Sequence, residues 1–197
     1  YPITKTAEGY TFEIDENQNA TLIKTDILAE TIEIPSEISS YKVKKLSCVE
    51  EAALVGVSLT GVFEGNNVVK EIIIPEGVVE TYGPAIANCY NLEKITIPGT
   101  MMTFDVVRCD NLKEVNIVDG DTITESFSFS DCSGLEEIYL PKQINKISTN
   151  AFARCYSLKN VKFSKNVYCI ESVAFQGCTS LTNIDLPDKL SEIGSNA

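Results

Sequence analysis

The segment from Leu135 to Ser180 contains the same 23-residue pattern twice in succession. The first copy reads LEEIYLPKQINKISTNAFARCYS and the second reads LKNVKFSKNVYCIESVAFQGCTS. Both copies carry apolar residues at their first, fourth and sixth positions, and both place a cysteine three residues after the phenylalanine of an Ala-Phe pair. A pattern that returns at a fixed period predicts a repeat architecture in which each copy is one structural unit.

The pattern extends in both directions from this segment. Its first apolar residue recurs at intervals of 23 residues, except for one interval of 20 between Leu92 and Leu112 and one of 40 between Ala29 and Val69. The first copy therefore carries an insertion of about 17 residues, near residues 48–62, and the last copy is truncated at Ala197. The copies begin at Ala29, Val69, Leu92, Leu112, Leu135, Leu158 and Leu181.

Each copy opens with an apolar-x-apolar alternation, which predicts a short β-strand whose middle residue faces outward. Proline follows most of these strands, as at Pro98 and Pro141, and ends them because it has no amide hydrogen to donate. One copy cannot bury its apolar side alone, so the copies are expected to stack into a solenoid. About seven parallel strands in one curved sheet are predicted, near residues 32–34, 72–74, 95–97, 115–117, 138–140, 161–163 and 184–186.

The segments that return from one strand to the next are expected to be irregular, with short 3₁₀ or helical turns at the Ala-Phe-x-x-Cys stretches. Residues 1–28 do not follow the period. Two alternating stretches, Tyr10–Ile14 and Ala20–Ile23, flank the polar turn Asp15–Asn19 and predict a β-hairpin that caps the first open edge of the stack. The predicted organisation is an N-terminal β cap at residues 1–28 and a repeat solenoid at residues 29–197.

Written out in full, the pattern LxxIxLPxxIxxIxxxAFxxCxx resembles the BspA-like class of leucine-rich repeat over roughly residues 29–197. The resemblance implies a leucine-rich repeat solenoid of the α/β horseshoe type. Members of this class are largely secreted or surface proteins of bacteria, and several are implicated in adhesion to host or matrix proteins. For this chain the resemblance implies an extracellular or cell-surface location. The tyrosine at position 1, with no apolar segment before it, fits a precursor that has lost its signal peptide.

Composition argues against several other classes of protein. The chain has 197 residues, with 16 Lys and Arg, 28 Asp and Glu, a net charge of -12 and no histidine. The acidity disfavours binding to nucleic acid or to an anionic membrane surface, since both need clustered Lys and Arg. The longest apolar run, Ala52–Val57, is far shorter than the roughly 20 residues that span a bilayer. Without histidine, Ser-His-Asp and Cys-His catalysis and His-ligated zinc are excluded.

No enzyme activity, cofactor or metal is therefore expected, although two features allow another interpretation. Asp119 and Asp121 in a DGD sequence could begin a calcium loop, but a turn that replaces the missing proline is preferred because too few carboxylates follow. Glu114 and Glu137 occupy the same position in adjacent copies and could approach each other as a catalytic carboxylate pair does. Two solvated charges with lysines nearby need no catalytic role, and that interpretation is preferred.

Five of the seven cysteines recur at one position of the repeat, which predicts a file of side chains pointing into the core. Buried structural thiols are favoured over disulfides, because parallel side chains in adjacent copies project side by side rather than toward each other. No CxxC pair occurs, so a metal site is disfavoured. Cys169, which is predicted to face outward, and Cys48 in the insertion are expected to be the more reactive thiols. The file consists of Cys89, Cys109, Cys132, Cys155 and Cys178.

Function is expected on the outward face of the sheet. The middle residues of the strands form a column in which Tyr139 is the one aromatic residue, and a central tyrosine ringed by polar residues is typical of a binding hot spot. We interpret the chain as a non-catalytic protein-binding module that uses this concave face, and the resemblance implies adhesion to a host or matrix protein as its context. A structural spacer that projects another domain, and a solvated face without any ligand, stay open as alternatives. The candidate partner-binding residues are Ile73, Thr96, Asn116, Tyr139, Lys162 and Asp185.

The insertion contains the sequence EAALVGVSLTG at Glu51–Gly61, which allows two interpretations. It could form a hairpin or flap that packs on the flank of the solenoid. Alternatively, it could be an exposed apolar element that contacts a partner, because exposed apolar patches usually mark interaction sites.

Overall fold

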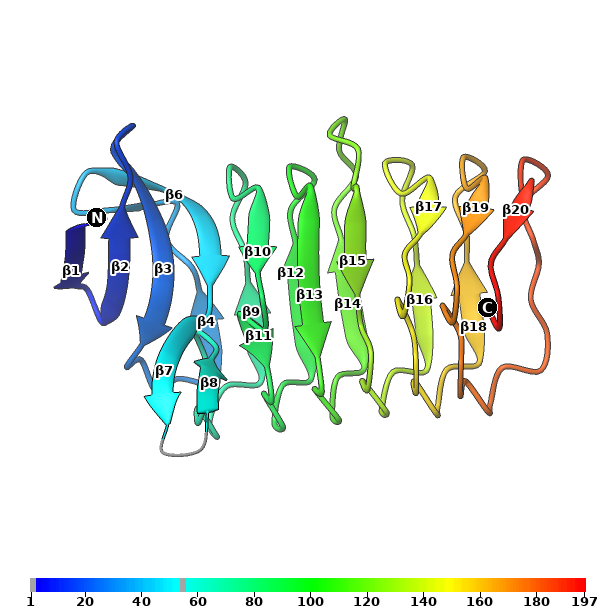
Figure 1. The fold of residues 1–197 in the computed structure, drawn as a ribbon, viewed down its shortest axis with the longest axis horizontal. Helices are drawn as coiled ribbons and strands as arrows, with labels where there is room; N and C mark the ends of the chain where they lie inside the picture. The colour runs from blue at the N-terminus through cyan, green and yellow to red at the C-terminus, as the bar shows by residue number, and fades with distance from the viewer. Residues whose placement is uncertain (1–2, 54–55) are drawn as a thin grey trace.

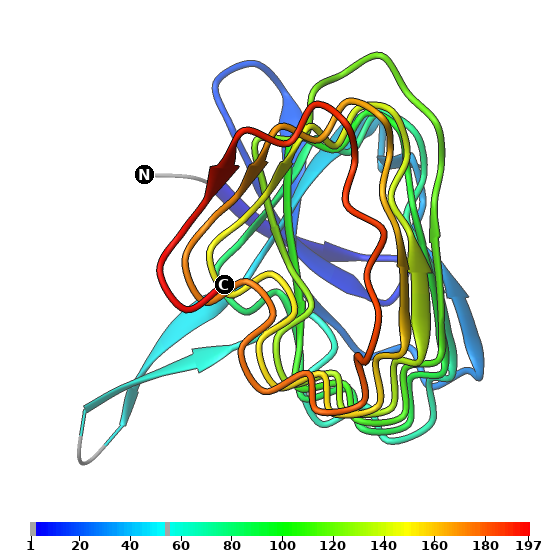
Figure 2. The same ribbon diagram turned by 90° about the vertical axis from the view of Figure 1, so that its right-hand side faces the viewer.

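The computed structural model describes residues 3–53 and 56–197. The chain coils into a β-solenoid of about seven turns, with parallel strands and no helix in the described residues. Figure 1 shows the turns side by side in a nearly straight row, and Figure 2 shows the outline that they share when viewed along the row. Most turns contribute one strand to a first face and one return strand to a second face, with the apolar core between the two faces.

The first face contains the strands that the repeat predicts. Neighbouring strands pair in parallel, and the paired residues reproduce the repeat intervals, since Glu71 lies beside Lys94 and Glu137 lies beside Asn160. The shorter interval is reproduced as well, because Lys94 also pairs with Glu114. The strands are β4 (Thr31–Glu33), β9 (Glu71–Ile73), β12 (Lys94–Ile97), β14 (Glu114–Ile117), β16 (Glu137–Tyr139) and β18 (Asn160–Lys162).

Two details of the predicted sheet are wrong. The face is divided, because β4, β9, β12 and β14 form one hydrogen-bonded sheet while β16 and β18 form another. The seventh strand, predicted near residues 184–186, does not form. Ile184 and Leu186 are 36% and 47% exposed, because within the described chain the last copy is covered on one side only.

The return segments also contain strands, which corrects the expectation of irregular or helical returns and of an α/β horseshoe. Most of these strands pair in parallel with the equivalent strand of the next turn, as Lys146 does with Cys169 and Cys169 with Glu192. The return strands are β6 (Tyr41–Ser47), β10 (Glu80–Tyr82), β11 (Ile86–Ala87), β13 (Thr103–Val107), β15 (Ser126–Ser128), β17 (Lys146–Ile147), β19 (Cys169–Ile170) and β20 (Glu192–Ile193), and β5 (Glu37–Ile38) pairs with β6 in an antiparallel hairpin.

The Ala-Phe-x-x-Cys stretches form single turns with hydrogen bonds between residues three apart, as in a 3₁₀ turn, and no helix forms in them. The amide of Ala153 donates to the carbonyl of Asn150, and the amide of Cys155 donates to the carbonyl of Phe152. Asn150 and Arg154 both have a left-handed backbone conformation, with φ angles of 60° and 61°. A right-handed helix cannot continue through such a residue, so each stretch is limited to about one turn.

The N-terminal residues form the predicted hairpin, extended by one further strand. Strands β1 (Ile3–Ala7), β2 (Tyr10–Ile14) and β3 (Asn19–Thr25) pair in antiparallel fashion. The carboxylate of Asp15 holds the hairpin turn by accepting the amide of Asn19 at 2.8 Å. Strand β3 then pairs in parallel with β6, so the hairpin covers the end of the second face and leaves β4 as the edge strand of the first. The domain boundary between residues 28 and 29 stays a prediction.

The insertion in the first copy forms a further hairpin. Strands β7 (Val49–Ala53) and β8 (Gly56–Thr60) are antiparallel, and Val49 pairs with Thr60 at the base. Figure 2 shows this hairpin projecting away from the outline of the stacked turns. It is therefore a projecting hairpin and not a flap packed along the flank. The side chains of residues 50–59 lie outside the described part of the structure, so the apolar contact element stays a prediction.

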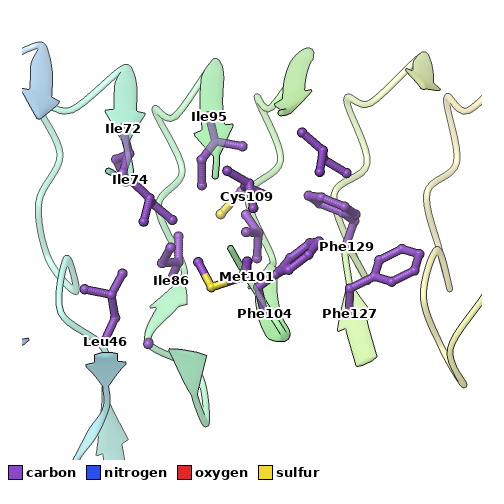
Figure 3. Close-up of a cluster of buried hydrophobic side chains, with 14 of the residues drawn as sticks. Leu46, Ile72, Ile74, Ile86, Ile95, Met101, Phe104, Cys109, Phe127 and Phe129 are labelled. Atoms are coloured by element: carbon purple, nitrogen blue, oxygen red, sulfur yellow. The ribbon is translucent and has the colours of Figure 1, made fainter. Parts of the chain in front are cut away.

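The core positions that the repeat predicts are confirmed for the central copies but not for the last one, where Ile193 is 63% exposed. Phenylalanine rings stack along the row of turns, with ring centroids 6.0 Å apart for Phe129 and Phe152 and 5.2 Å apart for Phe152 and Phe175. Figure 3 shows the neighbouring part of this core, in which Phe104 and Phe127 lie beside Phe129. Six residues predicted to be nearly fully buried are all buried, namely Leu135, Ile138, Leu140, Phe152, Cys155 and Leu158.

The cysteine file points into the core as predicted. Its five members are free thiols, of which four are buried and Cys178 is half-buried. Asn66 takes the same position in an earlier turn, where its Nδ2 donates to the carbonyl of Ile27 at 2.8 Å and so joins the solenoid to the N-terminal segment. The prediction for Cys169 is wrong. This residue is only 8% exposed and burial raises the pKa of its thiol, so it is not a reactive surface cysteine.

Candidate partner-binding face

The structure brings the predicted site residues together in two groups on the outward side of the first face. Ile73, Thr96 and Asn116 are in register across β9, β12 and β14. Tyr139 and Lys162 are in register across β16 and β18. The first group is hydrogen-bonded through one sheet and the second group through the other, so the division of the face runs through the middle of the predicted site.

Exposure separates the predicted residues further. Tyr139 is 55% exposed, and Asn116 and Lys162 are also exposed, whereas Ile73 and Thr96 are half-buried between their neighbours. Asp185 is exposed but belongs to no strand, because the seventh strand does not form. The turns run in a nearly straight row, so this face is not the concave side of a horseshoe (Figure 1).

A hollow of about 170 Å³ lies where β14 faces β16, and we call it the Tyr139 hollow. It lies on the division between the two sheets, where no ladder hydrogen bond joins the described residues of β14 and β16. Its residues are Lys113, Glu114, Val115, Glu137, Ile138, Tyr139 and Lys162. Two predicted site residues, Tyr139 and Lys162, therefore line the same depression. Beside it lies a second hollow, lined by Lys113, Glu136, Glu137, Lys159 and Asn160.

Paired charges surround the Tyr139 hollow. The ammonium of Lys94 lies 3.0 Å from the carboxylate of Glu114 and 3.4 Å from that of Glu71, and these hydrogen-bonded carboxylates raise the pKa of Lys94. On the other side, Lys159 lies 2.7 Å from Glu136 and lowers the pKa of that carboxyl. The Lys159–Glu136 pair is exposed and the Lys94 pairs are partly exposed, so they orient the side chains on the rim more than they stabilise the fold.

The charged half of the hollow was not part of the predicted site. Lys113, Glu114 and Glu137 line it, although the predicted site contained only the middle residue of each strand. The sequence does carry a signal for Lys113, because the residue after the leading apolar position alternates in sign of charge from copy to copy. This column reads Glu30, Lys70, Glu93, Lys113, Glu136 and Lys159.

The family model of the BspA-type leucine-rich repeat region matches residues 60–107 and 107–197, in six copies. The chain belongs to this family. No curated protein matches the sequence. A leucine-rich repeat fold with strands in place of helical returns is therefore the framework that carries the Tyr139 hollow.

Two solved structures share this leucine-rich repeat fold. A leucine-rich cell surface protein from Faecalibacterium prausnitzii superposes with a TM-score of 0.77 and 26% sequence identity over all of this chain. The present chain spans about half of that relative, covering 52% of its length. A leucine-rich repeat protein from T. pallidum has the same TM-score of 0.77 with 19% identity, and the match covers 98% of this chain and 86% of that one. At 19% identity the likeness shows the fold alone.

The DGD segment of the leucine-rich repeat chain forms a bend held by the next turn. Asp121 pairs with Lys142 at 2.8 Å, and the amide of Gly120 donates to the side chain of Gln143 at 3.2 Å. Gln143 donates in return to the carbonyl of Val118 at 2.7 Å. A Cβ on Gly120 would collide with the backbone of Gly99, so the bend depends on glycine in both neighbouring turns.

Two further properties concern the described residues only. No group of three or more His, Cys, Asp and Glu side chains among them is arranged to hold a metal ion. None of the secondary structure found in residues 3–53 and 56–197 is a helix long and apolar enough to cross a membrane.

Proposed function

We propose that this chain is a non-catalytic protein-binding module of a bacterial cell-surface or secreted protein, and that it binds a host or matrix protein through the first face. The observation that carries the proposal is the placement of Tyr139. This residue is 55% exposed, pairs in register with Lys162 on the next strand and lines the Tyr139 hollow. A large, semi-rigid aromatic side chain in a depression with a charged rim is the usual composition of a binding hot spot.

The strand face suits a protein partner because its backbone is already ordered. Binding to a hydrogen-bonded strand array loses little backbone entropy, which leaves more of the interaction free energy for affinity. The rim carries both signs of charge, with Lys113 and Lys162 beside Glu114 and Glu137. Such a rim selects a partner that offers complementary charges of both signs rather than a uniformly charged polymer.

The proposed location rests on the relative from F. prausnitzii, which is a leucine-rich cell surface protein. Adhesion is proposed because a module on the cell surface meets matrix and serum proteins first. The alternative of a structural spacer differs in one respect that can be measured, since a spacer needs no partner for its lateral face.

The test measures binding of immobilised matrix and serum proteins to the purified chain by surface plasmon resonance. For a partner found in this way, Tyr139→Ala and Lys162→Ala should each weaken the affinity by at least about fivefold, or about 1 kcal/mol. Tyr168→Ala is the matched control, because Tyr168 is 42% exposed and directly precedes return strand β19. If Tyr168→Ala weakens binding and Tyr139→Ala does not, the first face is not the binding surface. If none of the proteins binds, the spacer is the better description.

A further inference from the structure

A further depression lies away from the first face, between the turns that close the first and second copies. It has a volume of about 280 Å³, and we call it the Gly65 pocket. Its wall is unusual for this acidic chain because most of it consists of side-chain amides, and neither Lys nor Arg contributes to it. The residues are Glu64, Gly65, Asn66, Asn67, Asn88, Tyr90 and Asn91.

The pocket exists because of a glycine at one position of the repeat. The residue before the cysteine slot has a left-handed conformation in each turn, with φ angles of 57° at Asn88 and 61° at Arg154. In a later turn this side chain fills the space between copies, where Arg154 donates through Nε and Nη2 to both carboxylate oxygens of Asp131. In the first turn the position is Gly65, with a φ angle of 75°, and a Cβ there would meet nothing within 4 Å. The space that a side chain occupies elsewhere is therefore open here.

Asn66 gives the pocket a fixed floor. This side chain is buried, and three hydrogen bonds to the backbone hold it in place. Its Nδ2 donates to the carbonyl of Ile27 at 2.8 Å, and its Oδ1 accepts the amides of Val68 and Val69 at 3.1 and 3.0 Å. A wall held by three hydrogen bonds does not need to reorganise when a ligand enters, which lowers the cost of binding.

The other amides are available to a ligand. Asn91 uses its Nδ2 to bind the carbonyl of Asn67, which leaves its Oδ1 as an acceptor. Asn88 uses its Oδ1 to accept from Tyr90, at 3.5 Å, which leaves its Nδ2 as a donor. The side chain of Asn67 has no hydrogen-bond partner among the described residues. Each amide offers both donors and acceptors, so the set can bind groups that are themselves both donor and acceptor, as hydroxyls are.

Tyr90 adds an apolar surface beside these amides. The side chain is 57% exposed, so the ring borders the pocket and is open to solvent. We propose that the Gly65 pocket binds a neutral carbohydrate residue, whose hydroxyls bond to Asn67, Asn88 and Asn91 and whose C–H face packs against Tyr90. Glu64 and the absence of a cationic residue from the lining disfavour acidic sugars and phosphates. The volume is at the small end of ligand sites and fits one sugar ring, such as the terminal residue of a glycan.

The test is the binding of the purified chain to an array of immobilised neutral and acidic glycans. Gly65→Asn should reduce binding of the neutral glycans about tenfold or more, because the new side chain fills the pocket. Asparagine tolerates a positive φ angle, and it already stands at the equivalent position as Asn88, so the variant should fold. The matched control is Gly177→Asn, at the same position of a later turn with a φ angle of 81°, which should bind as the wild type does.

A second variant tests whether Gly65→Asn acts by filling the pocket or by disturbing the fold. Tyr90→Ala removes an exposed ring and should also weaken binding of the neutral glycans, while thermal unfolding stays close to that of the wild type. Tyr139→Ala should leave glycan binding unchanged, since the pocket does not depend on the first face. The proposal is wrong if no neutral glycan binds, if acidic glycans alone bind, or if Gly65→Asn binds neutral glycans as strongly as the wild type.

Discussion

The thiol of Cys155 donates a hydrogen bond of 3.1 Å to the carbonyl oxygen of Phe129, which lies 26 residues earlier in the preceding copy. Cys132 and Cys178 repeat this contact with the carbonyls of Val106 and Phe152, at 3.2 and 3.1 Å. The cysteine file therefore joins consecutive turns as well as filling the core. A contact that recurs from turn to turn adds to the interface between copies, on which the stability of a repeat protein depends.

The first prediction concerns the reactivity of this file. Burial raises the pKa of the Cys155 thiol to about 12 and that of Cys178 to about 11. Near pH 8 almost none of either group is thiolate, so both should react very slowly with an aromatic disulfide reagent in the native protein. After denaturation without reductant, at least five thiols should react. Two or more disulfides within the file would contradict the packing described above.

The same pKa values predict how stability varies at high pH. In the unfolded chain these thiols ionise near their ordinary pKa of 9.0, whereas in the folded chain Cys155 holds its proton until about pH 12. The folded state thus binds more protons in this interval, so the free energy of unfolding should decrease from about pH 9 upward. Cys155→Ala should make this decrease shallower in urea denaturation curves, and an unchanged slope would show that the thiol is not protected in the folded state.

The second prediction concerns the stacked rings. Phe152 is fully buried between Phe129 and Phe175, whose planes lie within 12° and 13° of its own. Phe152→Ala should lower the free energy of unfolding by about 3–5 kcal/mol, because it leaves a cavity between turns. Phe175→Ala is the comparison, and it should cost less because Phe175 is half-buried near the C-terminal end. Equal losses in free energy of unfolding would mean that a ring at the centre of the stack contributes no more to stability than a ring near its end.

The strands of the first face could be predicted for two reasons. The apolar alternation identifies which residues of each strand point into the core, and the repeat interval fixes the register between strands of adjacent copies. The return strands were missed because segments such as Lys146–Ile147 are too short to show an alternation of their own. Phe127 was missed for another reason. It stands five residues before Cys132, as Phe104 does before Cys109, and the two rings stack at 5.6 Å. The copy that begins at Leu92 is three residues shorter than the 23-residue copies. Phe104 and Phe127 therefore stand at different distances from the leading residues of their copies, and an alignment on those residues does not bring the two phenylalanines together.

The third prediction concerns Tyr10 in the N-terminal hairpin. Its side chain is buried, and its hydroxyl is the buried side-chain polar atom for which the described residues offer no hydrogen-bond partner. An unsatisfied buried hydroxyl costs about 1–3 kcal/mol, so Tyr10→Phe should raise the free energy of unfolding. Tyr41→Phe is the control, because its hydroxyl accepts a bond of 2.8 Å from Lys5 and its loss should not stabilise the protein. Destabilisation by Tyr10→Phe in urea titrations would show that this hydroxyl has a partner.

The fourth prediction concerns Asp105 on return strand β13. Burial raises the pKa of this carboxyl above its ordinary value of 3.8. A raised pKa means that ionisation costs stability, and the cost is absent below the unfolded pKa and grows as pH rises through the folded one. Asp105→Asn should therefore stabilise the protein at pH 7, by less than about 1 kcal/mol because the group is partly solvated. The gain should vanish near pH 3, while the exposed control Asp188→Asn changes little at either pH, and a gain that persists at low pH would refute this account.

The candidate site could be predicted only in part. Tyr139 and Lys162 were found because a strand places alternate residues on one face, and adjacent copies then bring equivalent residues together. The division between β14 and β16 could not be found in this way, since both strands carry the same apolar alternation on either side of it. The Gly65 pocket could not be predicted either. A single glycine in the sequence indicates only a turn, and the pocket depends on which side chains of the adjacent turn lie around that glycine.

Site-specific photocrosslinking to a bound matrix or serum protein tests the central claim, binding through the first face, most directly. A benzophenone side chain introduced at Asn116 lies in the predicted column beside the Tyr139 hollow without replacing Tyr139 or Lys162. The same group introduced at Tyr168 lies next to return strand β19 and serves as the control. The account predicts a crosslinked complex from position 116 and none from position 168. Crosslinking from position 168 alone would contradict it.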